Sequence, residues 1–307
     1  MINNTLEYAQ TLDNQDPLAY MRKHFSIPKQ ADGSDEFYFT GNSLGLQPAL
    51  AKDAVMEMLD AWQERGVKGH FEGDYPWMPY HEFITEHAAA IVGAQTNEVV
   101  MMNSLTANLH FMMATFYLPQ GKRTKILIED HAFPSDHYAV ESQIKHHNLS
   151  PEDNLILWSP REGEELLNYQ DLDRLLTEHG HEIALILLPG VQYYTGQVLD
   201  MKVITEKAHA LGITVGFDLA HAAGNIELSL HDWQVDFACW CSYKYLNSGA
   251  GSVAGCFVHQ KHAQNTELNR LAGWWGHDKD SRFKMQNNFK AIPSAEGWQL
   301  SNPPVLS

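Results

Sequence analysis

From about residue 98 onward, short apolar runs alternate with helical stretches, and this alternation limits the fold more than any other feature of the chain. Runs that are apolar throughout are typical of strands covered on both faces. Strands that alternate with helices predict a mostly parallel sheet with right-handed crossovers, and hence an α/β fold with helices flanking the sheet. The expected strands lie at 98–102, 125–128, 154–158, 183–188 and 213–217.

The stretch before this alternation, up to about Gly93, is expected to be helical with loops. Residues 48–65 carry apolar side chains at helical spacing, with Pro48 suited to the first turn and Gly66 suited to the C-terminal cap. The apolar residues make one helical face: Leu50, Ala54, Val55, Met58, Leu59 and Trp62.

Length and charge narrow the class of protein. The chain has 307 residues, enough for one large domain or two modest ones at ~100–200 residues each. Its 21 Lys and Arg against 38 Asp and Glu leave a formal charge of −17, which argues against a nucleic-acid partner. The N-terminus lacks the blocks of a signal peptide, and no window approaches the ~18 apolar residues of a membrane span, so we expect a soluble cytoplasmic protein. The three cysteines, Cys239, Cys241 and Cys256, follow no disulfide framework and are expected to be small buried side chains.

Ligands of parallel α/β sheets bind beyond the carboxyl ends of the strands, so the residues that follow each run are the candidates. After the first run, Ser104 opens a helix whose start could bind an anion or be an ordinary cap. After the second run, Phe133 could stack on a planar ring or serve packing alone. After the fourth run, Tyr194 could donate to a phosphate or lie in a simple turn.

Asp218 ends the fifth run, and His221 follows it three residues later. A carboxylate that ends a buried strand is unfavourable unless it is paired, and a protonated pyridine nitrogen is a suitable partner. A catalytic dyad and a metal site are the competing interpretations. Because no HExxH motif or Cys/His cluster is present, we expect no metal.

Lys244 ends another apolar, aromatic run and precedes a loop of small residues at 248–252. An exposed lysine is the ordinary interpretation, but burial favours the neutral amine that forms a Schiff base. Ser242 to Lys244 lie 24 to 26 residues beyond Asp218. Together these features meet the needs of pyridoxal phosphate: donors for the phosphate, an anion for the ring nitrogen and a lysine for the aldehyde.

At these residues the chain resembles the kynureninase family, within the class V aminotransferase group of fold-type I pyridoxal-phosphate enzymes. The resemblance covers nearly the whole chain from about residue 37. Its motifs are GNSLGLQP at 41–48, NSLT at 103–106, FPSD at 133–136, YTGQ at 194–197, FDLAH at 217–221, SYKYLN at 242–247, GWWGH at 273–277 and SNPP at 301–304.

The resemblance implies a pyridoxal-phosphate-dependent hydrolase that cleaves L-kynurenine, or its 3-hydroxy form, to an anthranilate and L-alanine. It implies a place in tryptophan catabolism and pyridine nucleotide biosynthesis, a small amino-acid substrate and a homodimer. By motif, Lys244 resembles the Schiff-base lysine and proton shuttle, and Tyr243 resembles a proton donor. Asp218 resembles the ring-nitrogen partner, supported by His221.

The same motifs imply the rest of the site. Phe133 resembles the ring that stacks on the pyridine. The other positions of the cofactor shell are Leu105, Thr106, Pro134, Ser135, Asp136, Tyr194, Tyr243, Trp274 and Asn302. In similar homodimers the positions of Trp274 and Asn302 reach the site from the partner subunit. The substrate-facing positions are Ser43, His70 and Asn302.

Two departures from the family pattern stand out. Pro189 occupies a position where some relatives carry a hydroxyl residue near the cofactor, so that contact is lost. Family members continue past SNPP with a C-terminal small domain that supplies an arginine for the substrate α-carboxylate, and we expect that domain to be cut short here. The expected domains are a helical segment of the small-domain and dimer region at 1–60, the large cofactor domain at 61–290 and the start of the small domain at 291–307.

Two alternatives stay open at this point. Another class V enzyme, such as a cysteine desulfurase or an aminotransferase, would share the lysine region. A desulfurase needs a mobile cysteine on a late loop, whereas Cys256 lies in an apolar, strand-like run at 253–258. The second alternative is a truncated protein that binds pyridoxal phosphate without turnover, because the carboxylate-binding arginine is absent.

Overall fold

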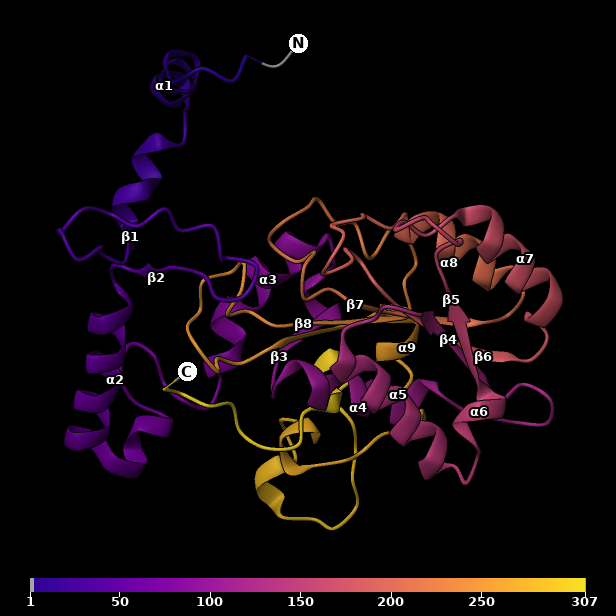
Figure 1. Cartoon of the computed structure of the whole chain (residues 1–307). Helices are drawn as coiled ribbons and strands as arrows, with labels where there is room; N and C mark the ends of the chain where they lie inside the picture. Colours follow the sequence, from indigo (N-terminus) through magenta and orange to yellow (C-terminus); the bar gives the residue numbers. More distant parts are fainter. Residues whose placement is uncertain (1–2, 307) are drawn as a thin grey trace.

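The computed structural model describes residues 3–306. Its main body is a seven-stranded sheet with helices on both faces, which Figure 1 shows edge-on. The strands lie in the order β3-β9-β8-β7-β6-β4-β5. Their bounds are β3 Val99–Met101, β4 Lys125–Glu129, β5 Leu155–Trp158, β6 Ile183–Pro189, β7 Thr214–Asp218, β8 Phe237–Trp240 and β9 Gly255–Val258.

The sheet is mostly parallel, and the strands predicted from the apolar runs are confirmed. β5, β4, β6, β7 and β8 run in one direction, while β9 is antiparallel to both of its neighbours. One detail of the prediction is wrong: Lys244 does not end a strand. β8 ends at Trp240, because the chain then leaves the sheet, and Lys244 lies in the turn that follows.

Helices bury their apolar faces against both sides of the sheet (Figure 1). One side is covered by α3 Thr85–Val92, α7 Tyr169–His179 and α8 Met201–His209. The other side is covered by α4 Leu105–Phe116, α5 Pro134–His146 and α9 Gln260–Ala263. A short helix, α6 Pro151–Asn154, leads into β5. Within the described residues, each helix is too short or too polar to cross a membrane.

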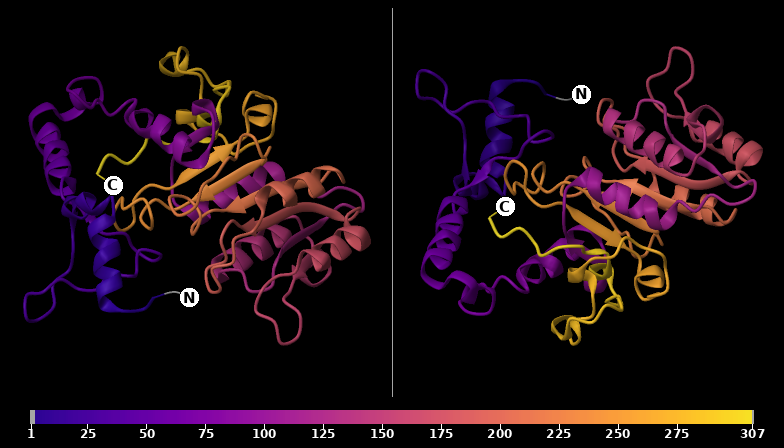
Figure 2. Two further views of the ribbon diagram at one scale, coloured as in Figure 1. Left: turned by 90° about the horizontal axis from the view of Figure 1, so that it is seen from above. Right: turned by 90° about the horizontal axis from the view of Figure 1, so that it is seen from below.

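The N-terminal residues 3–65, here named the arm, stand beside the sheet rather than on it (Figures 1 and 2). The arm contains α1 Leu6–Gln15, η1 Ala19–His24, β1 Phe25–Ser26, β2 Gln47–Pro48 and α2 Ala51–Arg65. The helix α2 starts later than predicted, because Pro48 pairs with Phe25 in a two-stranded ribbon. Gly66 caps α2 at a φ of 52°, as predicted.

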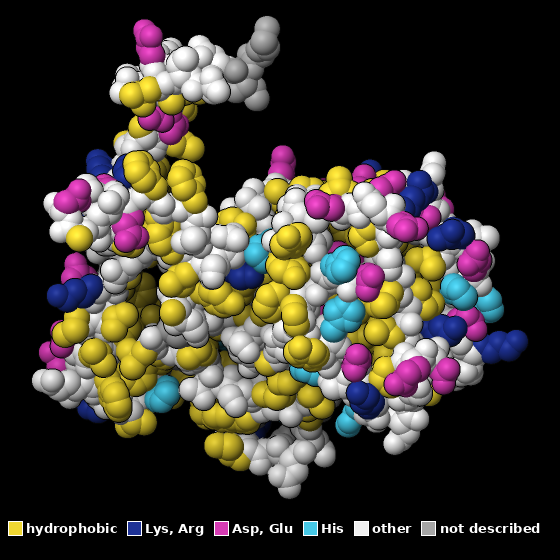
Figure 3. Space-filling model, viewed as in Figure 1, with side chains coloured by type: hydrophobic (Ala, Val, Ile, Leu, Met, Phe, Trp, Pro, Cys, Tyr) yellow, Lys and Arg dark blue, Asp and Glu magenta, His cyan; other side chains and the backbone are white. Residues whose placement is uncertain are grey.

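The predicted apolar face of α2 is mostly uncovered. Met58 and Ala61 are the buried residues of this helix. Leu50 is 75% exposed and Trp62 is 61% exposed, and apolar side chains gather on this part of the surface in Figure 3. The face therefore has the spacing of a packed helix but is left uncovered by residues 3–306.

Short 3-10 helices make up much of the rest: η2 Gly66–His70, η3 Tyr80–Ile84, η4 Thr96–Glu98, η5 Trp274–Gly276, η6 Arg282–Lys284 and η7 Ala295–Trp298. Ala295 and Trp298 of η7 belong to the core on the α4 side, and the Trp298 indole donates to Thr115 Oγ1 at 3.0 Å. The packed core on this side of the sheet therefore extends to Trp298. Beyond it the chain runs back toward α2 in every view (Figures 1 and 2).

Candidate active site

A cavity of about 480 Å³ lies at the carboxyl ends of β4, β6 and β7, beside the turn that follows β8. This is the edge at which a parallel sheet is expected to bind ligands. Many of the predicted residues line it, although they come from separate segments of the chain. They are Ser43, Leu105, Thr106, Phe133, Ser135, Asp136, Asp218, His221, Tyr243 and Lys244.

Asp218 provides a buried anion at the cavity wall. Asp218 is only 6% exposed, and its Oδ1 accepts a hydrogen bond from the backbone N–H of Ala220 at 2.7 Å. Burial raises the pKa of Asp218, and the nearby charge of Lys244 only partly opposes this. A carboxylate in such surroundings gains stability when a cationic ligand group comes to lie against it.

Two more carboxyl groups surround Asp218. Asp136, in the first turn of α5, hydrogen-bonds to Asp218, and burial together with the charge of Asp218 raises its pKa well above the usual value. Glu129 ends β4 with 2% exposure, and burial raises its pKa to about 7. We infer that Asp136 holds a proton and donates it to Asp218, so that the negative charge resides on Asp218.

Lys244 points toward His221. Its Nζ lies 3.0 Å from His221 Nε2. Burial and the charge of Lys244 lower the pKa of His221 to about 4, so the imidazole is neutral at pH 7. A neutral imidazole accepts a hydrogen bond from the lysine amine, and this contact fixes the end of a long and otherwise flexible side chain.

The opposite wall of the cavity is suited to an anion. The helix α4 starts at Leu105, and the side chain of Ser104 makes no capping hydrogen bond. The N–H groups of a first helical turn have no partner within the helix, so they are available to a bound anion. The hydroxyl groups of Thr106 and Ser135 lie 2.9 Å apart at the same wall, the second of them from the start of α5.

Phe133 and Tyr193 add an aromatic surface. Phe133 lines the cavity and is 53% exposed, and its ring is nearly perpendicular to that of Tyr193, at 88° with a centroid distance of 5.4 Å. A perpendicular contact of this kind leaves a face of Phe133 available to stack on a planar ligand.

The cavity thus fits pyridoxal phosphate. The buried carboxylate of Asp218 suits a protonated ring nitrogen, and the start of α4 with the Thr106 and Ser135 hydroxyls suits the phosphate. Lys244 supplies an amine for the aldehyde, and Phe133 supplies a ring for stacking. The cavity offers a carboxylate on one side and hydrogen-bond donors on the other. It therefore suits a flat ring with a cationic nitrogen and an anionic phosphate, as in this cofactor.

Some predicted residues lie elsewhere in this chain, and their roles stay predictions. Tyr194 is 81% exposed and lines a neighbouring cavity of about 320 Å³. The Trp274 indole donates to the carbonyl of Arg282 at 3.1 Å. The other three are Pro134, the first residue of α5; His70, in η2; and Asn302, exposed near the C-terminal end.

The cavity also contains residues that sequence reasoning missed. Glu129 ends β4 as Asp218 ends β7, so the rule about strand ends could have found it. Asn42 and Tyr193 adjoin the predicted Ser43 and Tyr194. Ser104, which the sequence indicated as a possible anion site at a helix start, also lines the cavity, whereas Val191 and Ala220 carry no signal that separates them from ordinary loop residues.

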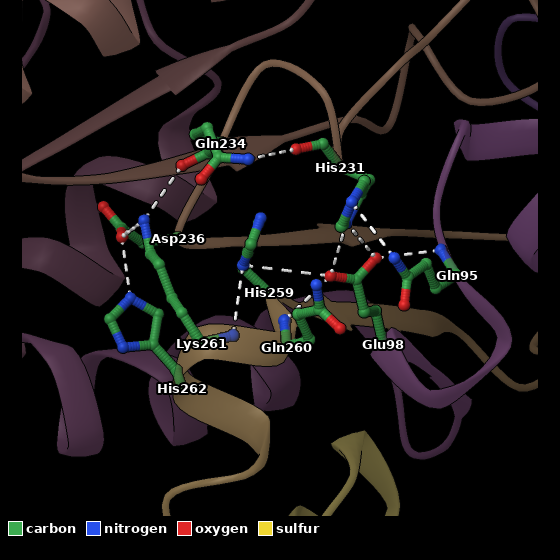
Figure 4. A network of polar contacts seen from close by, with 9 residues as sticks. All are labelled: Gln95, Glu98, His231, Gln234, Asp236, His259, Gln260, Lys261 and His262. Atoms are coloured by element: carbon green, nitrogen blue, oxygen red, sulfur yellow. Dashed lines mark hydrogen bonds and ion pairs between the residues drawn. The ribbon is translucent and has the colours of Figure 1, made fainter.

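A second polar network lies at the opposite edge of the sheet, where β3 and β8 begin and β9 ends (Figure 4). The buried carboxylate of Glu98 lies 2.9 Å from His231 Nδ1 and accepts from the backbone N–H of Gln260 at 2.8 Å. The rings of His231 and His259 stack with their planes 8° apart. Parallel rings aim their nitrogen lone pairs in parallel rather than at a shared point, so we interpret this cluster as structural rather than as a metal site.

Asp236 anchors the other half of this network. Its carboxylate accepts hydrogen bonds from His209 at 2.8 Å and from His262 at 2.7 Å, and Lys261 lies 2.8 Å away. Burial alone would raise the pKa of Asp236, but these partners lower it below the usual value. The charged carboxylate therefore ties α8 and α9 to the start of β8.

Comparison with known families agrees with the geometry. Residues 47–266 match the aminotransferase class V family. A kynureninase from Flavobacterium psychrophilum is 52% identical over 307 residues, which is 100% of this chain and 72% of the relative. A kynureninase from Myxococcus xanthus is 52% identical over 306 residues, covering 100% of this chain and 72% of the relative, and one from Nematostella vectensis is 51% identical over 311 residues, covering 98% and 67%.

Solved structures of similar fold include more distant proteins. A cystine C-S lyase in complex with cysteine persulfide aligns with a TM-score of 0.69 at 18% identity, covering 88% of this chain and 68% of the lyase. The apo structure of a cysteine desulfurase from Thermococcus onnurineus aligns with a TM-score of 0.68 at 16% identity, covering 100% of this chain and 69% of the desulfurase. At these identities the likeness establishes the fold alone.

Proposed function

The chain belongs to the kynureninase family, within the class V aminotransferases, and from this premise we propose that it hydrolyses L-kynurenine, or its 3-hydroxy form, to an anthranilate and L-alanine. It is a pyridoxal-phosphate-dependent hydrolase by family. The observation that carries the proposal in this chain is the meeting of Lys244, His221 and Asp218 in one cavity at the carboxyl edge of the sheet.

When bound, pyridoxal phosphate supplies an aldehyde that joins amines and a protonated ring that accepts electrons from bonds at the substrate carbons. Asp218 would keep the ring nitrogen protonated, and Asp136 would hold Asp218 in its charged form by donating to it. Thr106, Ser135 and the start of α4 would bind the phosphate. Phe133 would cover one face of the ring.

Proton transfer is assigned to two neighbouring residues. Lys244, once released from the cofactor, would take the α-proton of the substrate as a general base, with neutral His221 orienting its amine. Burial raises the pKa of the Tyr243 phenol, so this side chain keeps its proton through the neutral range. Water would add to the aryl ketone carbon, and the bond from that carbon to the substrate β-carbon would then break to release the anthranilate carboxylic acid. Tyr243 is suited to donate the proton that the β-carbon then needs to give L-alanine.

The proposal is tested with the purified protein. Supplied with pyridoxal phosphate and L-kynurenine, it should release fluorescent anthranilate and L-alanine in equal amounts. 3-Hydroxykynurenine, assayed in parallel, ranks the two substrates. A protein that takes up the cofactor and shows its visible absorption, yet forms no anthranilate from either substrate, would refute the assigned reaction and favour a cofactor-binding protein without turnover.

Desulfurase chemistry has no support from the position of the cysteines. Cys239, Cys241 and Cys256 are buried, and Cys256 lies within β9 opposite Cys239. The thiols of Cys239 and Cys256 are fixed inside the sheet, and Cys241, just after β8, is buried, so none of them is placed to travel to a substrate sulfur. Release of sulfide from cysteine is therefore not expected.

We propose further that two copies of the chain form a homodimer through the uncovered face of α2. Trp274, Asn302 and His70 lie outside the cavity of their own chain, so a second copy could bring them to it. Sedimentation velocity should give twice the 34.7 kDa of the chain. Trp62→Glu should shift the protein toward monomer, whereas the same charge at the adjacent exposed position, Gln63→Glu, should not. A monomeric wild-type protein would contradict the proposal.

The domain limits and a cytoplasmic location stay predictions.

A further inference from the structure

The arm packs against the backbone of the lysine turn, here defined as residues 243–247. The backbone N–H of Gly45 donates to the carbonyl of Tyr243 at 2.8 Å. A Cβ atom at position 45 would lie 2.3 Å from the carbonyl oxygen of Lys244 and 2.2 Å from Oδ1 of Asn247. Real Cβ atoms essentially never approach closer than 3.0 Å, so this contact has room for glycine alone.

The lysine turn is tightly held on other sides as well. The N–H of Asn247 donates to the carbonyl of Lys244 at 3.3 Å, and Asn247 adopts a φ of 55°. A Cβ atom at Gly224 would lie 2.6 Å from Leu246 Cδ2. The turn therefore cannot yield to a larger residue at position 45 without moving the backbone that carries Lys244.

The segment that carries Gly45 also reaches the cavity. Asn42 and Ser43 line it, three and two residues before Gly45. The phenol of Tyr38 donates to the carbonyl of Leu44 at 2.7 Å and holds the segment from the arm side. A displacement of Gly45 would consequently move Ser43 and Lys244 relative to each other.

We propose that Gly45 is a positioning residue for Lys244: through its contact with the lysine turn, the arm sets where the lysine amine stands in the cavity. The proposal rests on the assignment of Lys244 as the residue that attaches the cofactor. It implies that seating of the arm and attachment of pyridoxal phosphate are coupled, so that each favours the other.

The first test compares Gly45→Ala with Gly41→Ala. Position 41 is a matched control, because a Cβ atom there meets nothing within 4 Å. Gly45→Ala should attach pyridoxal phosphate to Lys244 more weakly, as read from its visible absorption and from the borohydride-fixed peptide. The pH at which that absorption changes should shift, and kcat should fall about 10²-fold, as for a reacting group moved by about 1 Å. Gly41→Ala should match wild type in all of these.

A second variant separates the two contacts. Gly45→Ala combined with Asn247→Gly removes the clash with the Asn247 side chain and leaves the clash with the Lys244 carbonyl. Attachment should stay weak in this double variant. Full recovery would assign the effect to Asn247 and overturn the proposal.

A measurement on wild type covers the case in which Gly45→Ala fails to fold. Hydrogen exchange of the Gly45 amide should slow when pyridoxal phosphate attaches, while that of Gly33, which bonds to Gln30 elsewhere in the arm, should not change. Equal exchange at Gly45 with and without cofactor would overturn the coupling. If wild type and Gly41→Ala do not attach the cofactor at Lys244 at all, the assignment of Lys244 fails instead.

Discussion

Replacing Lys244 with alanine is expected to reduce anthranilate formation on the order of 10³-fold or more, because one side chain both attaches the cofactor and moves the α-proton. Borohydride treatment of wild type should fix a pyridoxyl group on the peptide that contains Lys244, and the variant should lose this label. The variant should still bind pyridoxal phosphate without a covalent bond, since the Thr106 and Ser135 hydroxyls and Asp218 remain.

The control for this experiment is Lys202→Ala, on the exposed surface of α8, which should keep full activity and full labelling. Lys244→Arg separates the effect of a positive charge at this position from that of cofactor attachment. Arginine keeps a cation near His221 but cannot attach the aldehyde. Near-normal turnover in Lys244→Arg, or a pyridoxyl label on a different lysine in wild type, would contradict the assignment.

Replacing Asp218 with asparagine is expected to have opposite effects on activity and on stability. Turnover should fall about 10²-fold or more, because a neutral amide cannot keep the ring nitrogen of the cofactor protonated. The unfolding midpoint of the cofactor-free protein should rise, because the change removes a buried carboxyl group whose charged form is poorly solvated. Asparagine still offers an oxygen to the N–H of Ala220, so the local turn is preserved.

The pH dependence of stability follows from the direction in which burial shifts the pKa of Asp218. Burial raises the pKa of Asp218 above its usual value of 3.8, so the folded chain binds this proton more tightly than the unfolded chain does. Stability of the cofactor-free protein should therefore fall as the pH rises above about that value, and Asp218→Asn should reduce the fall. Burial also raises the pKa of Glu129 from its usual 4.5 to about 7. This group should therefore add a further loss of stability as the pH rises from 4.5 to about 7.

Urea unfolding of the cofactor-free protein at pH 5 and pH 8 measures this effect. Asp153→Asn, at an exposed position in α6, is the control and should leave the pH dependence unchanged. A lower midpoint in Asp218→Asn than in wild type at pH 8 would show that the carboxylate stabilises the empty fold, and would contradict the proposed role of the cofactor as its missing partner.

The errors of sequence reasoning have identifiable physical causes. Pro48 has the right residue type for a helix start, but a pairing with Phe25 that is remote in sequence places it in a strand. The strand before Lys244 ends at Trp240, and Cys241 is buried without belonging to the sheet, so its apolar character was misleading. Glu129 was missed although it ends a strand, since no motif draws attention to a lone glutamate.

The amino-acid sequence by itself determined the alternation of strands and helices, the edge of the sheet at which a ligand is expected, and the lysine and aspartate that suit pyridoxal phosphate. These follow from local periodicity and from residue chemistry, which depend on neighbours along the chain. Tertiary structure alone decided that Asp136 and Glu129 crowd Asp218, that His221 meets the lysine amine, and that Gly45 seats against the lysine turn. Those contacts join residues far apart in sequence, and their distances are set by the packing of the whole sheet and the arm, which no local pattern encodes.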